Sequence, residues 1–447
     1  MDCSTPRLII SSYKGKSGKT LATIALARSL ISKGYKVSIF KVGPDYIDPS
    51  YHSVVTGKLS RNLDYILMGD KIIGRFCEHS AGSDIALIEG VAGLYDSPDG
   101  ESEIGSTAQL SKLLKAPVVI VINGERINRT AGAIIRGLKD YDREVKIVGA
   151  IITNVVNGQE EKIKKAVEKE GVEVLGAIKR SEKIEEMMKY RHLGLVHANE
   201  IERDKILLLA NMASKGLDAE RSLKIARESS EPLSFYKQEG KISVKKKVKI
   251  AIALSRAFSF YYPETIEYAS EAAELSFVDP EKDQEINADV LIIGGGFPEV
   301  YAEELERNKP FINSLRKHID DGKPFYGECG GLIYLTEALY YKGSEYKMSG
   351  VFDAYSVFMD KPVGHGYAFA EVIKDNLIAK KGAILKGHEF HHIKIIAKSA
   401  ENLTIKYVKG SGINGLDGFY VKNAYASFLH LHPETINFLE KILYKFV

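Results

Sequence analysis

PRLIISSYKGKSGKTLATIALARSLISKGYKVSIFKVG (6–43) decides the fold of the first half of this 447-residue chain. The apolar run at 6–11 predicts a buried strand, 17–35 has the pattern of a helix that ends at Gly34, and 36–43 predicts the next strand. Further apolar runs that predict strands lie at 84–90, 116–123 and 145–154. Strand–helix alternation of this kind predicts a parallel sheet that is covered by helices on both faces.

A polar stretch without periodicity, ESSEPLSFYKQEGKISVKKK (228–247), separates the two halves of the chain. Its proline, its glycine and its run of lysines are typical of a linker, which we place at 233–247. A new strand pattern follows, and strand-like segments continue to AYASFLHLH (424–432). The sequence therefore predicts an α/β protein with two domains, 1–232 and 248–447, each built on a mostly parallel sheet flanked by helices.

Charge and composition exclude several classes of protein. The 62 basic and 59 acidic residues give a formal net charge of +3, which argues against a nucleic-acid coat or a polybasic membrane binder. The apolar stretches are shorter than the roughly 18–20 residues of a membrane span, and no signal segment opens the chain. Cys3, Cys77 and Cys329 are too few and too scattered for a disulfide framework or a zinc cluster. We therefore expect a cytoplasmic protein in which a lone cysteine can be a nucleophile.

The loop SSYKGKSGKT (11–20) lies where a strand gives way to a helix, which is the setting of a phosphate-binding loop. Gly18 allows phosphates to approach the backbone N–H groups, Lys19 can reach the β- and γ-phosphates, and the Thr20 hydroxyl can bind Mg²⁺. The strict G-x4-G-K-[ST] motif is broken by Tyr13, and Lys14 matches the additional lysine of signature-lysine ATPases. The alternative is a turn that is rich in glycine and lysine by chance.

Acidic residues follow the later strands at the same predicted edge of the sheet. Asp45 and Asp48 follow the second strand, and Glu89 and Asp96 follow the strand at 84–90. Ligands of open α/β sheets bind beyond the carboxyl ends of the strands, where carboxylates supply the hard oxygen ligands that Mg²⁺ prefers. Each of these residues alone is more often a turn or cap residue. Together, beside a phosphate loop, they predict a metal–nucleotide site.

PFYGECGGLIYL (324–335) predicts a strand, a tight turn and a helix, with Cys329 at the turn. This is the pattern of a nucleophile elbow, which exposes the thiol and directs a helix N-terminus at it, so we expect a lowered pKa for Cys329. The Gly330 N–H can donate to an oxyanion, and a second donor can come from Gly295 or Gly296. The alternative is a buried cysteine that acts as a small apolar residue.

The thiol needs a base, and two later segments offer histidines. ASFLHLHPE (426–434) contains His430 and His432, two apart on a predicted strand, and we expect them to face opposite sides. One would face the cysteine and the other would face solvent or packing. A zinc site is the competing hypothesis for the histidines, but no cysteine pair accompanies them. Further pocket candidates from GHEFHHI (387–393) are His388, Glu389 and His391.

The two halves together resemble the cobyrinate a,c-diamide synthases, the glutamine-dependent amidoligases of corrinoid synthesis, over nearly the whole chain. The resemblance implies a P-loop NTPase-like ATP domain similar to dethiobiotin synthetase, followed by a class I glutaminase domain. The motifs that carry it are FKVGPDYIDP (40–49), SRNLD (60–64), EGVAGLYD (89–96), GSTAQL (105–110), YRHLGLVHANE (190–200), GGGFPE (294–299), YGECGGLIYL (326–335), GHEFHH (387–392) and ASFLHLH (426–432).

The resemblance also implies an activity. ATP would phosphorylate a carboxylate of cobyrinate, Cys329 would release ammonia from glutamine, and ammonia would displace the phosphate. His430 matches the Ser-aromatic-x-His pattern of the activating base, and His432, which begins a His-Pro-Glu triplet, is the second choice. The implied cofactors are ATP and Mg²⁺, the partners are these small molecules, and we expect a homodimer. The implied residues are Cys329, His430, Gly330 and Gly296 for catalysis, Lys14, Gly15, Gly18, Lys19, Thr20, Lys41, Asp45 and Asn154 for the nucleotide, and Thr20, Asp48, Glu89 and Asp96 for the metal.

Three residues depart from the family pattern. Lys16 replaces a glycine of the phosphate loop, Asn123 stands where Asp is common, and His365 stands where Arg is common. A nickel-sirohydrochlorin a,c-diamide synthase is an alternative, because that acceptor presents similar acetate groups. A partitioning-type ATPase switch is the alternative from another class, suggested by Lys14, although such a switch has no need for a cysteine elbow.

Overall fold

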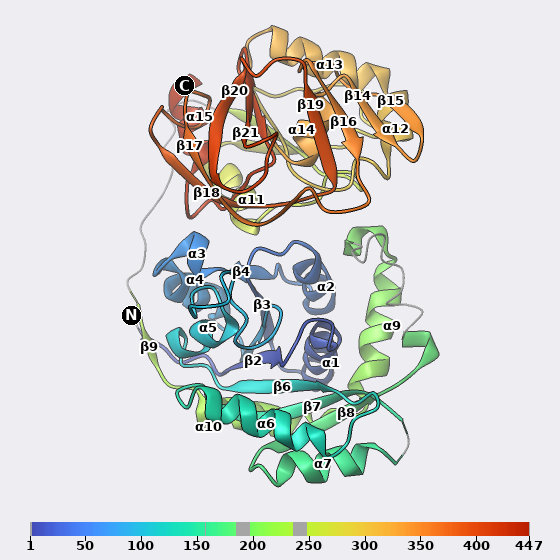
Figure 1. Ribbon diagram of the computed structural model, residues 1–447, viewed down its shortest axis with the longest axis vertical. Coiled ribbons are helices and arrows are strands. Elements are labelled where there is room, and N and C mark those ends of the chain that lie inside the picture. Colours follow the sequence, from blue (N-terminus) through green and yellow to red (C-terminus); the bar gives the residue numbers. More distant parts are fainter. Residues whose placement is uncertain (1, 157, 185–196, 236–247, 447) are drawn as a thin grey trace. The chain divides into compact units, whose positions relative to one another are not determined.

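The computed structural model describes residues 2–156, 158–184, 197–235 and 248–446 (Figure 1). It divides into two compact units, Met1–Gln238 and Glu239–Val447, and each is described by itself. Most of the linker predicted at 233–247 and most of the motif at 190–200 lie outside the described residues. The first two linker residues belong instead to a strand of unit 1, because Leu233 is buried in the core of that unit.

Unit 1 follows the predicted alternation of strands and helices (Figure 1). Its described elements are β1 (Asp2–Cys3), β2 (Arg7–Ser12), α1 (Lys19–Ser32), β3 (Val37–Val42), α2 (Ile47–Thr56), β4 (Arg61–Leu63), α3 (Tyr65–Met68), α4 (Lys71–Ser80), β5 (Ile85–Glu89), α5 (Thr107–Leu113), β6 (Val118–Asn123), α6 (Thr130–Tyr141), β7 (Ile147–Val155), α7 (Glu160–Glu168), β8 (Glu173–Lys179), η2 (Ala198–Glu200), α9 (Arg203–Ser214), α10 (Ala219–Ser229) and β9 (Leu233–Ser234).

The sheet of unit 1 has the strand order β4-β3-β5-β2-β6-β7-β8, and every neighbouring pair in it is parallel. β2 and β5 are buried along their whole length, as expected for parallel strands that are covered on both faces. Because the strands run the same way, the loops after β2, β3, β5 and β7 leave the same edge of the sheet. This edge positions the predicted nucleotide site.

Helices cover both faces of this sheet. α4, α5, α6 and α7 contribute apolar side chains to one core cluster with the strands, and α1 packs against the strands together with α2, α9 and α10. The alanine-rich α1 is buried over most of its length because other helices lie over it. Cys3 and Cys77 also lie in the core of unit 1, with a side-chain hydrogen bond between them, and both are free thiols.

Unit 2 combines helices with two sheets (Figure 1). Its described elements are β10 (Lys249–Ala253), α11 (Pro263–Ala272), β11 (Glu274–Val278), β12 (Val290–Ile293), α12 (Ala302–Arg307), α13 (Lys309–Asp320), β13 (Phe325–Glu328), α14 (Gly330–Leu335), β14 (Ala338–Tyr341), β15 (Ser344–Lys347), β16 (Ala354–Phe358), β17 (Gly364–Val372), β18 (Ile384–His391), β19 (Ile393–Ala397), β20 (Leu403–Lys409), β21 (Leu416–Val421), β22 (Ala424–Ser427), β23 (His430–Leu431) and α15 (Phe438–Phe446).

The large sheet of unit 2 has the order β11-β10-β12-β13-β22-β21-β20-β17-β18-β23. Its neighbours are parallel from β11 to β22 and antiparallel from β22 to β23, because short turns such as 422–423 join adjacent strands in the second half. A smaller sheet has the order β15-β14-β16-β19. The predicted α/β fold with two domains is confirmed, and unit 2 adds an antiparallel half to its parallel strands.

Core clusters lie on both faces of the large sheet of unit 2. α13 and α14 pack on one face, and α11 and α15 pack on the other. Among the described residues, no helix combines the length and the apolar composition that crossing a lipid bilayer requires.

Candidate active sites

The loop after β2 has the conformation of a strained turn before a helix. Gly18 precedes α1 with a left-handed φ of 88°, and a Cβ there would lie 3.3 Å from the side chain of Thr153. Lys16 is also left-handed, with φ 58°, although it replaces a glycine of the family pattern. A Cβ on Gly15 would meet nothing within 4 Å. The backbone therefore requires a glycine at Gly18 and not at Gly15.

Lys19 is the first residue of α1 and is 8% exposed. Its Nζ donates to the backbone oxygen of Ala92, at 2.5 Å, in the loop after β5. Burial, followed by the positive charge of Lys41, lowers the pKa of Lys19 to about 8. The side chain thus places a partly desolvated amine at the carboxyl edge of the sheet.

Thr20 brings together the two carboxylates predicted from different strands. Its hydroxyl lies 3.1 Å from Oδ1 of Asp48 and 2.7 Å from Oε1 of Glu89. Lys41 is 2% exposed and contacts the same two carboxylates. Its Nζ lies 2.9 Å from Asp48 and 3.3 Å from Glu89. Asp45 is farther from this amine, at 3.9 Å.

The charges of this group explain its shifted pKa values. Burial alone would lower the pKa of Lys41, but the three carboxylates outweigh burial and raise it. Burial would raise the pKa of Asp48, but Lys41 overcomes burial and lowers it. Burial and the neighbouring Asp48 raise the pKa of Asp45 to about 7. Asp48 is therefore ionised and paired with the Lys41 amine.

The oxygens around Thr20 fit a magnesium site that the nucleotide would complete. Thr20, Asp48 and Glu89 place a hydroxyl and two carboxylates within hydrogen-bond distance. In the described part of the chain, no group of three His, Cys, Asp or Glu side chains is arranged to hold a metal by itself. Mg²⁺ commonly takes one or two carboxylates and completes its shell with water and phosphate oxygens. The donor set here is of that kind.

His52 is a residue of this site that sequence reasoning missed. It is fully buried, with Nε2 2.6 Å from Oε2 of Glu89 and Nδ1 3.1 Å from the hydroxyl of Ser60. The signal was available, because His52 follows Asp48 by four residues and both lie on α2. Residues at that spacing share a helix face.

The remaining predicted residues of unit 1 have other hydrogen-bond partners or face outward. Asp96 accepts the Gly93 N–H at 2.6 Å, which fixes the loop that holds Lys19. The side chain of Asn154 contacts Asn123 at 3.4 Å. Lys14 is exposed and lies over the ring of Tyr13. Their predicted contacts with nucleotide and metal stay predictions.

The Cys329 turn is a tight elbow between β13 and α14. Cys329 has φ 44° and ψ −90°, is 4% exposed, and its N–H donates to Ser427 at 2.8 Å. A Cβ on Gly331 would lie 2.2 Å from the carbonyl oxygen of Ile293, so no larger residue fits without a backbone shift. The elbow predicted from the sequence is present, and it is more buried than expected.

The 294–296 turn packs directly on the elbow. The Gly331 N–H donates to the Gly294 oxygen at 3.1 Å, and a Cβ on Gly330 would lie 3.3 Å from the Gly296 nitrogen. A Cβ on Gly296 would lie 2.1 Å from the oxygen of Ala257. The two predicted oxyanion donors therefore lie on adjoining turns that leave no room for side chains.

The pKa of the Cys329 thiol is raised, not lowered. Burial is the main cause, and the carboxylates of Glu299, Glu328 and Glu389 add to it. A hydrogen bond from the Gly330 N–H to the sulfur opposes the shift but does not reverse it. The prediction of a lowered pKa is wrong, because the sequence does not show which carboxylates the fold brings to the helix end.

His430 lies beside the elbow. Its ring is 1% exposed, its Nδ1 is 3.2 Å from Oε2 of Glu328, and its Cε1 is 2.6 Å from the place that a Cβ of Gly295 would take. The ring also stacks on His388, with centroids 4.8 Å apart. These contacts place His430 against the turn that borders the Cys329 elbow.

His432 is also buried, so of the two expected surroundings, solvent or packing, the structure shows packing. Its ring centroid lies 4.3 Å from that of Tyr262, and its Nδ1 accepts the N–H of Glu434 at 3.1 Å. Residues two apart on a strand share a face, so the spacing does not predict that the two histidines face opposite sides. His432 itself lies one residue beyond the end of β23. Tyr262 also contacts His388, which joins the three histidines in one cluster.

His388, Glu389 and His391, the pocket candidates from 387–393, are all buried within unit 2. Burial, followed by the neighbouring histidines, holds the pKa of His388 well below its usual value. The Glu389 carboxylate accepts the N–H groups of Ser411 and Gly412, both at 2.8 Å. His391 stacks on Phe428 with centroids 3.6 Å apart.

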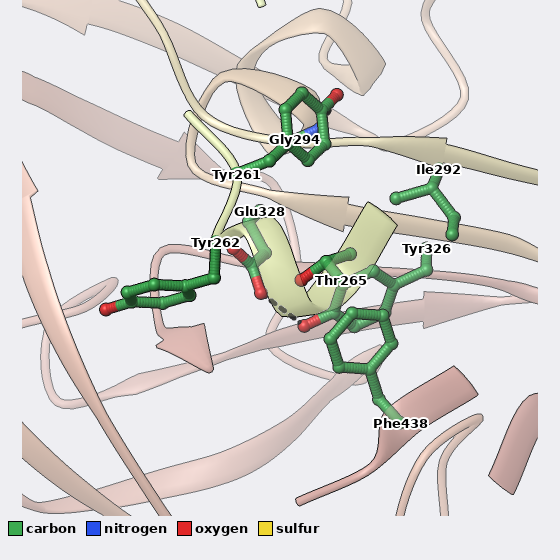
Figure 2. Close-up of a pocket in the computed structure, with 8 residues that line it drawn as sticks. All are labelled: Tyr261, Tyr262, Thr265, Ile292, Gly294, Tyr326, Glu328 and Phe438. Atoms are coloured by element: carbon green, nitrogen blue, oxygen red, sulfur yellow. Dashed lines mark hydrogen bonds between the residues drawn. The ribbon is translucent and has the colours of Figure 1, made fainter. Parts of the chain in front are cut away.

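A small pocket is lined in part by Glu328, the residue before Cys329. Figure 2 shows the Glu328 carboxylate pointing toward the Tyr326 hydroxyl there. The residues that line it are Tyr261, Tyr262, Thr265, Ile292, Gly294, Tyr326, Glu328 and Phe438.

Comparison with known proteins agrees with the division into two units. Residues 8–193 match the CobQ/CobB/MinD/ParA nucleotide binding domain family, and residues 249–438 match the CobB/CobQ-like glutamine amidotransferase domain family. A cobyrinate a,c-diamide synthase of Archaeoglobus fulgidus is 41% identical over 96% of this chain and 94% of its own length. Proteins of the same name from Methanosarcina acetivorans and Methanobrevibacter smithii are 40% and 38% identical, over 96% and 95% of this chain and 93% and 95% of their own lengths.

Proposed function

Because the chain belongs to the cobyrinate a,c-diamide synthase family, we propose that it uses ATP and glutamine to convert the a and c acetate carboxylates of cobyrinate into amides. It is a ligase with a nucleotide-binding domain and a glutamine amidotransferase domain. One observation carries the proposal. The chain holds two sites of different chemistry, a phosphate loop beside buried lysines and carboxylates in unit 1 and a cysteine elbow beside buried histidines in unit 2.

The site in unit 2 supplies ammonia. The Cys329 sulfur attacks the side-chain amide carbon of glutamine, and His430 takes the thiol proton and passes it to the leaving ammonia. The N–H groups of Gly330 and Gly296 stabilise the oxyanion. Water then hydrolyses the thioester to glutamate. Because the pKa of Cys329 is raised, the thiol stays protonated until the base acts on it.

The site in unit 1 activates the acceptor. An acetate oxygen attacks the terminal phosphorus of ATP, ADP leaves, and ammonia displaces phosphate from the acyl phosphate to give the amide. Lys19 stabilises the charge on the transferring phosphoryl group, and Gly18 lets the loop backbone approach the phosphates. Thr20, Asp48 and Glu89 would hold Mg²⁺, which when bound neutralises phosphate charge.

The proposal extends to the substrates, the cellular location, the oligomeric state and the acceptor. The substrates are small molecules, and we infer that the enzyme works in the cytoplasm as a homodimer. Cobyrinate is favoured as the acceptor because the related proteins carry that name, and nickel-sirohydrochlorin is the alternative. A partitioning-type ATPase switch is not favoured, since it has no use for a glutamine amidotransferase domain.

An amidation assay tests the acceptor. The chain is supplied with ATP, Mg²⁺ and glutamine, together with cobyrinate or nickel-sirohydrochlorin in separate reactions, and the products are identified by mass. We expect two amidations of cobyrinate. Amidation of nickel-sirohydrochlorin alone would replace the proposed acceptor, and ATP turnover without glutamine hydrolysis would favour the switch.

The Cys329→Ser variant tests the division of labour between the sites. We expect it to lose glutamine-dependent synthesis and to keep synthesis from added ammonium. Cys3→Ser, which changes another buried thiol in the other unit, is the matched control and should keep both activities. Loss of ammonium-dependent synthesis in Cys329→Ser would contradict the assignment.

A further inference from the structure

Glu328 immediately precedes the nucleophile and is 6% exposed. Its Oε1 accepts hydrogen bonds from the Tyr326 hydroxyl at 2.6 Å and from the Leu431 N–H at 3.2 Å. Figure 2 shows the first of these bonds at the edge of the pocket. Its Oε2 lies 3.2 Å from Nδ1 of His430. The two donors on Oε1 fix the carboxylate so that its other oxygen faces the histidine.

We propose that Glu328 is the carboxylate that positions His430 for glutamine hydrolysis, so that the nucleophile and the group that orients its base are consecutive residues at the end of β13. The inference rests on the proposed glutaminase function of unit 2. In this role Glu328 accepts the Nδ1–H of His430, which leaves Nε2 as the proton acceptor. An ionised carboxylate also stabilises the imidazolium that forms when the base takes the thiol proton.

Glu434 is the competing carboxylate, because it ends the His432-Pro433-Glu434 triplet. Its side chain accepts a hydrogen bond from the hydroxyl of Tyr268. Its backbone N–H occupies Nδ1 of His432, so that nitrogen accepts a hydrogen bond and cannot donate to a carboxylate. The geometry that orients a base through Nδ1 is therefore found at Glu328 and His430 and not at Glu434 and His432.

The position of Glu328 also fits the raised pKa of the thiol. A carboxylate next to the sulfur adds to the effect of burial and disfavours a free thiolate. When the thiol proton moves to the imidazole, the imidazolium forms beside the same carboxylate, and this attraction offsets part of the cost of the thiolate. The arrangement keeps Cys329 neutral at rest and makes its activation depend on the oriented base.

The test is the Glu328→Gln variant. The amide keeps the size of the side chain, and its oxygen can still accept from Tyr326 and Leu431. Its NH₂ group would then face His430, force Nδ1 to accept, and move the ring proton to the nitrogen that should act as base. We expect kcat of glutamine hydrolysis to fall roughly 10³- to 10⁴-fold, the loss typical of a wrong histidine tautomer, with KM for glutamine within about threefold of wild type.

Matched variants make the result specific. Glu434→Gln should keep kcat within about threefold, and Glu328→Asp should recover part of the activity lost in Glu328→Gln because it keeps the charge. Tyr326→Phe, which leaves the carboxylate and removes one of its two donors, should lower kcat roughly tenfold. Ammonium-dependent synthesis should stay at wild-type level in all four variants, since it does not need His430.

Several outcomes would overturn the proposal. They are a Glu328→Gln variant that keeps kcat, a fall in kcat in Glu434→Gln instead, or a rise in KM without a fall in kcat. If Glu328→Gln unfolds unit 2, as judged by near-UV circular dichroism, an unchanged kcat in both Tyr326→Phe and Glu328→Asp would also overturn it. A Cys329→Ser variant that still hydrolyses glutamine would instead refute the glutaminase function itself.

Discussion

The loop before α1 and the turn before α14 are the same kind of junction, a parallel strand that enters a helix through a strained residue, yet they hold different chemistry. At the first, the Lys19 amine lies near a group in which Lys41 neutralises Asp48 and Glu89. At the second, burial raises the pKa of a thiol, and the neighbouring carboxylates add to that shift. Both junctions offer backbone N–H groups, so the difference between them lies in the reactive side chain, its burial and the charges around it.

The two helices also differ in length. α1 has 14 residues and α14 has 6. The partial positive charge at a helix N-terminus comes from aligned peptide dipoles, so a helix of less than two turns opposes burial only weakly. At Cys329, burial and the carboxylates outweigh the N–H of Gly330 at the helix end, so a separate base is needed there.

The largest expected effect separates the two sites. Lys19→Ala should lower synthesis from both glutamine and ammonium by roughly 100- to 1000-fold or more, because it removes a charge that stabilises the transferring phosphoryl group. Glutamine hydrolysis should stay within a few-fold of wild type. The exposed Lys16 in the same loop gives the control variant Lys16→Ala, for which we expect near-normal synthesis. An equal fall in glutamine hydrolysis would show that the two sites do not act separately.

The next effect concerns the stability of unit 1. Lys41→Met would leave the buried Glu89 and the partly buried Asp48 without the amine that pairs with them, and breaking a buried pair in this way typically costs about 3–5 kcal/mol of unfolding free energy. Lys33, half-exposed and paired with Glu220, gives the control Lys33→Met, which should cost at most about 1 kcal/mol. Denaturant unfolding measures both. Equal costs would show that the carboxylates do not depend on Lys41.

A site residue could be predicted from the sequence where the motif that indicates it lies within one short segment or follows from the order of the strands. Gly18, Lys19 and Thr20 follow from the spacing within one loop. Asp48 and Glu89 follow from the rule that strand ends of a parallel sheet share an edge, and the structure brings both to Thr20. His52 was missed although a local signal existed, since it lies one helical turn after Asp48.

Cys329 shows what local patterns leave out. The elbow follows from GECGG, but Glu299 and Glu389 come from distant segments, and their effect on the thiol is a property of the fold. Glu328 lies next to Cys329 in the sequence, and yet its contact with His430 needs β23 to be placed beside β13. The antiparallel half of unit 2 was also beyond the pattern, because a buried strand gives the same apolar run in either direction.

The two turns should also tolerate an added methyl group differently. Gly331→Ala at the elbow would place Cβ 2.2 Å from a backbone oxygen, and we expect a loss of about 1–3 kcal/mol, toward the upper end. Gly18→Ala meets a side chain at 3.3 Å and a left-handed φ, for about 1–2 kcal/mol. Gly15→Ala, in open space, is the control and should change the unfolding free energy little. A larger loss at Gly18 than at Gly331 would contradict the tighter packing of the elbow.

The smallest effect is the reactivity of Cys329 as pH changes. Iodoacetamide reacts with the thiolate, so its rate at one site, followed by mass spectrometry of the peptide, reports the thiolate fraction. In the denatured chain, the rate should rise about tenfold per pH unit and level off near the ordinary thiol pKa of about 8.5. In the native protein, the raised pKa means that the rate keeps rising after that point.

The shape of this curve separates two causes of low reactivity. Burial that only blocks the reagent lowers the native rate by a constant factor at every pH, so the native and denatured curves would level off together. A raised pKa makes the native curve approach the denatured curve above about pH 8.5, because only the native thiol is still losing its proton there. A native rate that levels off below about pH 8 would mean that the helix N-terminus and the Gly330 N–H outweigh burial and the carboxylates. The Cys329 elbow would then be an anion site of the same kind as the loop before α1.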